Sequence, residues 1–378
     1  MVTDDQPHTG AWREGDPVGG RRFVDVGTVP LERGGEVPDV RLAYETWGTL
    51  ADDGRNAVLV LHALTGDSHV TGPAGPGHPT AGWWEGMVGP GRPLDTDRWF
   101  VVAPNVLGGC QGSTGPASAG PDGHPWGSRF PYLTVRDQVE AERRLTDALG
   151  IDRWAAVLGG SMGGMRVLEW AVMYPDRVES IAPIAVGAVA SADQIALQTI
   201  QIQAIRADPA YRGGDYLRDG GEAPRDGLAV ARRLAHWSYR SREELEGRFG
   251  RSPQEGEEPL GGGGRFAVTS YLDHHGAKLV RRFDATSYVV LTESMNGHDV
   301  GRGRGGVEAA LSRFRGPAVV VGIDSDRLYP LEEQDELARL LPGAGEGPAV
   351  IRSPHGHDSF LIETEEVGAA VEQLLGRI

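Results

Sequence analysis

The sequence predicts an α/β fold, in which a mostly parallel sheet is flanked by helices and carries an inserted helical lid. Short apolar runs alternate with amphipathic segments in the first half of the chain, as in strands joined by helical crossovers. After about residue 188 helical segments follow one another with no clear strand, and the alternation returns near residue 311. We therefore expect a core formed by 1–188 and 311–378, interrupted by a lid over 189–310.

The individual elements follow from local patterns. Apolar runs predict strands at 40–48, 57–64, 98–107, 153–160, 178–188, 317–324 and 348–354. Helical spacing predicts core helices at 134–150, 162–176, 331–343 and 362–377, and lid helices at 191–209 and 227–249. Thr134 is a suitable N-cap for the first helix, and Gly150 is expected to end it.

Composition narrows the function classes. The net charge of −16 argues against a nucleic-acid partner and against binding to an anionic membrane surface, so an anionic substrate would need local arginines. The N-terminus is polar and acidic and lacks a signal pattern, and no apolar run reaches the ~18 residues of a membrane span. The lone Cys110 excludes an intramolecular disulfide, fits a cytoplasmic protein and is expected to be structural.

One serine stands between glycines where a strand should give way to a helix. Residues 159–163 read Gly-Gly-Ser-Met-Gly, which fits the G-x-S-x-G pattern of an exposed nucleophile on a strained turn. The bland alternative is a glycine-rich turn in which Ser161 only caps the following helix. The strand before it and the helix after it favour the nucleophile.

A nucleophilic serine needs a histidine base and an orienting carboxylate, in the chain order serine, acid, histidine. The strand at 317–324 delivers Asp324 and Asp326, and the strand at 348–354 delivers His355 and His357. The residues alone leave both pairs open. His298, in a second Gly-His-Asp triplet, precedes the acid strand and therefore has the wrong order for the base.

The tetrahedral oxyanion of such a reaction needs two N–H donors. One should belong to Met162, directly after the serine, and the other to Leu64, in the loop 61–70 that follows the apolar run AVLVL. His62 and His69 lie in the same loop, and we expect them to support it structurally.

Motifs spread over most of the chain sharpen this interpretation. The sequence resembles the homoserine O-acetyltransferase family of α/β-hydrolase-fold enzymes. The resemblance rests on YETWGTL (44–50), HALTGDSHV (62–70), NVLGGCQGSTGP (105–116), GGSMGGMRVLEW (159–170), GLAVARRLAHWSYRS (227–241), GHDVGRGRGG (297–306), DSDRLYP (324–330) and GHDSFL (356–361).

The resemblance implies roles for the ambiguous residues. It makes Asp326 the acid and His357 the base of the triad with Ser161, and it assigns homoserine binding to Arg232 and Asp358, with Tyr239 lining the pocket. Homoserine is a zwitterion, so a guanidinium for its carboxylate and a carboxylate for its ammonium are chemically suitable. Family members are typically homodimers that contact through their lids.

The function implied is acetyl transfer from acetyl-CoA to the L-homoserine hydroxyl through an acetyl-serine intermediate, the first committed step of methionine biosynthesis by direct sulfhydrylation. Acetyl-CoA is then a cosubstrate, and no metal, nicotinamide or flavin is required. The lid is expected to exclude water. The alternatives are a succinyl-CoA-dependent homologue, an esterase or a transferase to another alcohol, and a non-catalytic binding protein.

Overall fold

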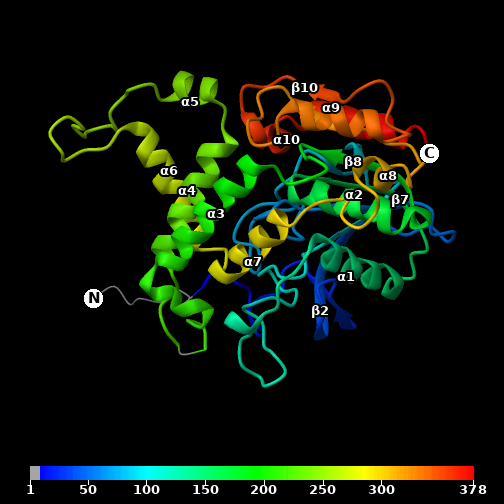
Figure 1. Cartoon of the computed structure of the whole chain (residues 1–378), viewed down its shortest axis with the longest axis horizontal. Helices are drawn as coiled ribbons and strands as arrows, with labels where there is room; N and C mark the ends of the chain where they lie inside the picture. Colours follow the sequence, from blue (N-terminus) through cyan, green and yellow to red (C-terminus); the bar gives the residue numbers. More distant parts are fainter. Residues whose placement is uncertain (1–8, 219) are drawn as a thin grey trace.

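The computed structural model describes residues 9–218 and 220–378 (Figure 1). Its centre is an eight-stranded sheet with the order β1-β2-β6-β3-β7-β8-β9-β10. Strand β2 runs antiparallel to both of its neighbours, and the pairs from β6 to β10 are parallel. The predicted fold class, a mostly parallel sheet flanked by helices, is therefore confirmed.

The strands of this sheet are short in its last third. Their bounds are β1 Arg22–Pro30, β2 Glu36–Trp47, β3 Ala57–Leu61, β6 Phe100–Pro104, β7 Trp154–Gly160, β8 Val178–Ile184, β9 Val321–Ile323 and β10 Ala349–Ile351. A separate two-stranded ladder consists of β4 Val88–Gly89 and β5 Leu94–Asp95.

Both faces of the sheet are apolar, which explains why the strands read as continuous hydrophobic runs. On β3, Val58 and Val60 pack into one buried cluster with side chains of α11 (Thr364–Leu375). Leu59 and Leu61 belong to the opposite cluster, which contains α1 (Val135–Ala148) and α2 (Met162–Met173). The remaining core helices are α8 Val307–Leu311, α9 Leu331–Leu340 and α10 Ser359–Ile362.

Between β8 and α8 the chain forms helices only, among the residues that the structure describes. They are α3 Ala192–Ala207, α4 Arg225–Tyr239, α5 Arg242–Arg248, α6 Ala267–Val280 and α7 Ala285–Asn296. Helix α4 packs against α3 and α6, and α7 packs against α3. Figure 1 shows this green-to-yellow group at one end of the molecule, beside the body that holds α1, α2 and α9. The predicted bounds of the lid stay a prediction.

Local signals worked well at the first core helix. Thr134 caps α1 by accepting from the Asp137 N–H, and the Asp137 side chain reaches back to the Thr134 N–H at 2.7 Å. This reciprocal capping satisfies two of the otherwise unpaired amides of the first helical turn. The N-cap prediction is confirmed.

One strand was not predicted, and one helix was predicted wrongly. In β1, polar residues and Gly27 interrupt the apolar alternation, and the pairing with β2 is irregular. The sequence predicted one helix over 227–249, which instead breaks between α4 and α5. Arg240 and Ser241 are extended there, and the Ser241 side chain accepts from the Glu244 N–H at 3.0 Å, starting a new helix.

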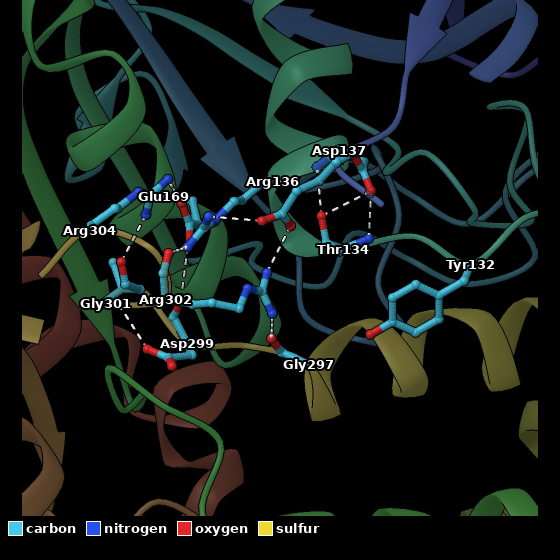
Figure 2. A network of polar contacts seen from close by, with 12 residues as sticks. Tyr132, Thr134, Arg136, Asp137, Glu169, Gly297, Asp299, Gly301, Arg302 and Arg304 are labelled. Atoms are coloured by element: carbon cyan, nitrogen blue, oxygen red, sulfur yellow. Dashed lines mark hydrogen bonds and ion pairs between the residues drawn. The ribbon is translucent and has the colours of Figure 1, made fainter. Parts of the chain in front are cut away.

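A buried polar network joins the 297–306 segment, which follows α7, to the first two core helices (Figure 2). Glu169 of α2 forms ion pairs with Arg136 at 3.2 Å and with Arg304 at 2.7 Å. Arg136 of α1 also donates to the backbone carbonyls of Asp299 and Arg302, at 3.1 and 2.8 Å. The chain leaving the helical group is thus fixed to the core by paired charges.

No helix in the described parts of the chain is long and apolar enough to cross a membrane.

Candidate active site

Ser161 occupies a sharp turn between β7 and α2. Its backbone has φ 57 and ψ −123, a region that non-glycine residues rarely adopt. A Cβ atom on Gly159 or Gly163 would lie only 2.5 or 2.1 Å from the Leu61 carbonyl oxygen, and one on Gly160 would lie 2.5 Å from the Phe360 ring. The glycines are therefore needed because neighbouring strands and a side chain approach the turn closely. Such a strained, buried serine is typical of a nucleophile.

Asp326 and His357 form a buried pair after β9 and β10. His357 Nδ1 lies 2.6 Å from Asp326 Oδ2. The carboxylate can only accept, so Nδ1 carries the proton and Nε2 is left as the basic nitrogen. The second oxygen of Asp326 accepts the N–H groups of Leu328 and Tyr329 at 2.8 and 3.0 Å, which fixes the carboxylate. His357 Nε2 is buried and has no partner within the described part of the chain.

Two aromatic rings connect this pair to Ser161. The Tyr329 ring stacks on His357 with centroids 5.1 Å apart, and its buried hydroxyl lies beside the Ser161 side chain. The Phe360 ring contacts the Gly160 position and lies 5.5 Å from the His357 ring. The structure thus brings Ser161, His357 and Asp326 together at the carboxyl ends of the parallel strands. Sequence reasoning did not single out Tyr329, although it lies within the DSDRLYP motif.

The electrostatics of His357 suit a general base. Burial alone would lower its pKa, but the adjacent Asp326 carboxylate outweighs burial and raises the pKa above the usual histidine value. A base with a raised pKa accepts a proton from a hydroxyl group more readily.

The other members of the ambiguous pairs have structural contacts instead. Asp324 is exposed and accepts the Ser353 N–H at 3.1 Å, which ties the ends of the last two strands together. His355 lies near Glu244 and Glu363, at 3.5 and 3.9 Å. His298 is buried, with Nε2 3.3 Å from the Gly187 carbonyl. None of these three contacts the Asp326–His357 pair.

The loop after β3 is built around two buried polar side chains. His62 accepts the Val106 N–H at Nε2 (3.0 Å) and donates from Nδ1 to the Ala63 carbonyl (2.7 Å), and burial lowers its pKa well below the usual value. Arg166 of α2 donates to the His62 carbonyl and pairs with Glu142 at 2.5 Å. The expectation that His62 supports this loop is confirmed.

The two expected oxyanion donors lie at the ends of adjacent strands. Leu61 of β3 pairs with Gly159 of β7, so the loop carrying Leu64 and the turn carrying Met162 emerge side by side. The Leu64 N–H has no hydrogen-bond acceptor among the described residues. Met162 is the first residue of α2, where backbone N–H groups have no partner within the helix. Both amides are thus available for a ligand.

A cavity of about 350 Å³ is lined by both residues expected to bind homoserine, and by Thr65, which directly follows Leu64. Arg232 of α4 donates to the Thr65 hydroxyl at 3.2 Å and forms no ion pair within the described residues. Asp358 directly follows His357. Tyr239 places its ring 5.6 Å from both the Arg232 guanidinium and the His357 ring. An arginine that forms no ion pair with the described residues and a carboxylate therefore line one cavity, next to the catalytic histidine in the chain.

Arg240 is a site residue that sequence reasoning missed. Its guanidinium bridges Asp358 at 3.1 Å and Glu244 at 3.2 Å. Burial raises the pKa of Asp358, and Arg240 and Arg232 partly offset this effect. Arg240 is presented to Asp358 because the helix breaks after Tyr239. The serine-x-x-glutamate spacing of Ser241 and Glu244 was the signal for that break.

Glu45, His69 and His78 form the one buried cluster of metal-ligand type found in the described residues. His69 Nδ1 lies 3.0 Å from Glu45, and His78 Nε2 accepts the Gly20 N–H at 3.0 Å. The two rings stack 3.7 Å apart at 9°. Parallel rings cannot both direct an in-plane lone pair at one ion, so the geometry favours a hydrogen-bonded support of the 65–78 loop over a metal centre.

Cys110 is buried, and burial raises the pKa of its thiol, so the expected structural role fits its surroundings.

Comparisons with known proteins agree with this geometry. A sequence family described as alpha/beta hydrolase fold matches residues 56–364. The homoserine O-acetyltransferase of Thermobifida fusca (strain YX) is 61% identical over 377 residues, which covers 100% of this chain and 99% of that protein.

Solved structures show the same relationship at lower identity. Homoserine O-acetyltransferase from Bacillus anthracis has a TM-score of 0.85 and 28% identity, covering 94% of this chain and 97% of that one. Esterase E22 has a TM-score of 0.84 and 25% identity, covering 94% and 99%. The fold is thus shared by transferases and esterases, while the high identity over the whole length is to a transferase. The chain belongs to the homoserine O-acetyltransferase family of the alpha/beta hydrolase fold.

Proposed function

We propose that this protein is a homoserine O-acetyltransferase that moves an acetyl group from acetyl-CoA to the hydroxyl of L-homoserine through acetyl-Ser161. One observation carries the proposal. One cavity is lined by Arg232, which forms no ion pair with the described residues, and by Asp358, which directly follows His357 of the buried His357–Asp326 pair, and their charges match the two charges of an amino acid. The 61% identity to a homoserine O-acetyltransferase supports the same substrate.

In the first half-reaction His357 Nε2 removes the proton of Ser161, and Ser161 Oγ attacks the thioester carbonyl carbon. The N–H groups of Leu64 and Met162 stabilise the oxyanion, each by roughly 3 kcal/mol. The carbon–sulfur bond then breaks, and His357 returns its proton to the leaving thiolate. Asp326 keeps the imidazole in the required tautomer and stabilises its charged form.

In the second half-reaction homoserine occupies the cavity. Arg232 binds the carboxylate with two parallel donors, and Asp358 accepts from the ammonium. Asp358 can do this while Arg240 remains held by Glu244, because the guanidinium already bridges both carboxylates. His357 deprotonates the substrate hydroxyl, whose oxygen attacks the acetyl carbon. The bond between that carbon and Ser161 Oγ then breaks, and His357 returns the proton to Oγ.

Acetyl transfer requires that homoserine, and not water, attacks the acetyl group on Ser161. Gly356, which precedes His357, has φ 67, and a Cβ there would lie 2.5 Å from the Tyr239 carbonyl of the helical group. The helices therefore contact the catalytic loop directly. We propose that this cover limits the entry of water and orients the alcohol. No metal or organic cofactor is required, because a thioester is already activated.

Two other functions use the same triad. The similarity to esterase E22 favours ester hydrolysis as the second candidate. In that case water would accept the acyl group, and Arg232 would be dispensable. A succinyl-CoA-dependent transferase would keep the triad and the amino-acid pocket and differ only in the acyl group.

The test is thiol release by the purified protein with acetyl-CoA or succinyl-CoA, with and without L-homoserine. The proposal predicts homoserine-dependent release with acetyl-CoA and its loss in Ser161→Ala. Release only with succinyl-CoA would keep the pocket and change the donor. Release independent of homoserine would contradict the proposed acceptor.

The remaining part of the proposal concerns assembly and location. Exposed apolar side chains on α3 and α4, including Ile200 at 52% and Trp237 at 50% exposure, support a homodimer that contacts through the helical group. The biosynthetic role and the single, buried cysteine support a cytoplasmic location. Sedimentation would test the dimer.

A further inference from the structure

A second cavity, of about 220 Å³, continues from the active-site cavity along the C-terminal end of α6. The two cavities share Thr80, Lys278 and Arg282 in their linings. The outer one is also lined by His274 and Arg281, and no acidic residue is among its described lining residues. Because their linings overlap, the cavities form one groove, whose inner end contains Asp358, the neighbour of His357, and whose outer end contains cations and no acidic residue among the described lining residues.

Three cations of the second cavity lack partners among the described residues. Lys278 and Arg281 are exposed and Arg282 is half-buried, and none of the three makes an ion pair or a side-chain hydrogen bond within the described residues. Neighbouring arginines of the helical group are paired, such as Arg233 with Asp273 at 3.0 Å. In a chain with a net charge of −16, three unpaired cations at one cavity indicate an anionic ligand.

Other charged groups at the groove lie at its inner end. Asp67 faces Arg282 without forming an ion pair, and Asp358 is held by Arg240. Burial and the nearby cations lower the pKa of His275 to about 3, so this ring adds no charge at neutral pH. The positive charge of the outer groove therefore comes from the lysine and the two arginines.

We propose that Lys278, Arg281 and Arg282 bind the phosphate groups of coenzyme A, with the thioester arm running inward toward Ser161. The inference rests on the proposed acetyl-CoA-dependent function and extends it to the acyl donor. The direction follows from the groove, since its inner wall contains Thr65 and Asp67, just after Leu64, and Asp358, just after His357. Phosphate groups at the outer end would place the reactive end of the donor at the triad.

The same groove would serve both half-reactions in turn. The pantetheine arm crosses the cavity that contains Arg232, and homoserine fills that cavity only after the thiol has left. This alternation fits a ping-pong sequence, in which the two substrates do not occupy the site together. It also predicts that removing the outer charges weakens donor binding and leaves homoserine binding unchanged.

The test compares two double variants that each remove two exposed positive charges. Lys278→Gln with Arg281→Gln changes the groove, and Arg313→Gln with Arg315→Gln is the matched control on the core. The first should raise the KM for acetyl-CoA about tenfold, equivalent to ~1.4 kcal/mol, with kcat retained. Its KM values for homoserine and for S-acetylpantetheine, which has no phosphate, should not change. Equal effects on both donors, or none, would overturn the proposal.

Two further measurements locate the phosphates and separate this proposal from the proposed function. Acetyl-dephospho-CoA lacks the 3′-phosphate. If the groove variant still has a raised KM for this donor, the cations bind the diphosphate; if its KM equals that of the wild type, they bind the 3′-phosphate. Calorimetric titration of CoA into Ser161→Ala needs no turnover. Weaker CoA binding after the groove charges are removed would support the phosphate site even if the wild type ignored homoserine, whereas unchanged binding would overturn it.

Discussion

The chain contains the triplet Gly-His-Asp twice, and the histidine and aspartate side chains of the two copies make different contacts. In the 356–358 copy His357 pairs with Asp326, its buried Nε2 has no partner among the described residues, and Asp358 lines the 350 Å³ cavity. In the 297–299 copy the imidazole of His298 faces a backbone carbonyl, and Asp299 accepts the Gly301 N–H at 2.8 Å. The same tripeptide forms a candidate catalytic centre in one place and a structural turn in the other.

The difference lies in the surroundings. The 356–358 copy follows β10 at the carboxyl edge of the sheet, where the buried carboxylate of Asp326 lies within hydrogen-bond distance of His357. The 297–299 copy follows α7, and its backbone is bound by Arg136, which Glu169 holds in turn (Figure 2). Chain order and strand position therefore predict chemistry better than the triplet itself.

Replacing the two histidines should give the largest difference between the two triplets. His357→Ala should lower kcat/KM by about 100,000-fold, because the serine loses its base and the transition state loses the imidazolium. His298→Ala should leave kcat near the wild-type value and lower only the free energy of unfolding. Steady-state kinetics and urea unfolding of both variants would check this. A comparable loss of kcat in both would contradict the assignment.

The stability of the segment that contains the 297–299 triplet should depend most on the charge of Glu169. Glu169→Gln leaves Arg136 and Arg304 without their buried counterion, and should lower the free energy of unfolding by about 3 kcal/mol. The exposed Glu308→Gln is the control and should stay within about 0.5 kcal/mol of the wild type. Equal effects of the two changes on urea unfolding would show that the network is not stabilising.

The aspartates of the two triplets should differ in substrate binding. Asp358→Asn removes the charge proposed for the ammonium and should raise the KM for homoserine about 30-fold, or ~2 kcal/mol. Asp299→Asn should not change this KM, because its side chain accepts the Gly301 N–H and is not among the described residues that line the cavity. Initial rates over a range of homoserine concentrations decide between them. An unchanged KM in Asp358→Asn would remove it from the pocket.

The pH dependence should report His357 alone. The base must be neutral to accept a proton, so kcat/KM should fall as the pH drops through its pKa, which Asp326 raises above the usual histidine range. Asp326→Asn removes the raising charge, so its residual activity should extend to lower pH. If kcat/KM of Asp326→Asn fell at the same acidic pH as that of the wild type, the acidic decrease would belong to a group other than His357.

The smallest effect is expected from Asp299→Asn on stability. The amide oxygen can still accept the Gly301 N–H, so the free energy of unfolding should change by less than about 1 kcal/mol. Thermal and urea unfolding would measure it. A larger loss would mean that the charge of Asp299 also supports Arg136 or Arg302.

The sequence predicted the sheet and the position of the triad because both depend on local patterns. Apolar runs mark the buried strands, and glycines around Ser161 mark a turn that admits no side chain. The residues alone left Asp324 and Asp326 equivalent, since both follow the same strand, and only the family resemblance favoured Asp326. In the structure both carboxylates accept backbone amides, and Asp326 is the one that faces the imidazole.

Other site residues depend on tertiary contacts that a single sequence hides. Arg240 reaches Asp358 because the chain breaks between two helices, and the hydrophobic pattern continues across that break. Tyr329 lies beside Ser161 because two strands far apart in sequence end at the same edge of the sheet. The sequence does not show that Lys278, Arg281 and Arg282 lack ion pairs while a neighbouring arginine such as Arg233 has one, because ion pairs depend on the folded structure.

The most direct test of the central claim is mass spectrometry of the protein after mixing with acetyl-CoA in the absence of homoserine. The account predicts one added acetyl group, located on the peptide that contains Ser161, and its rapid loss when L-homoserine is added, with O-acetylhomoserine as the product. Transfer to homoserine in a protein that never carries acetyl on Ser161, or that retains activity as Ser161→Ala, would contradict it.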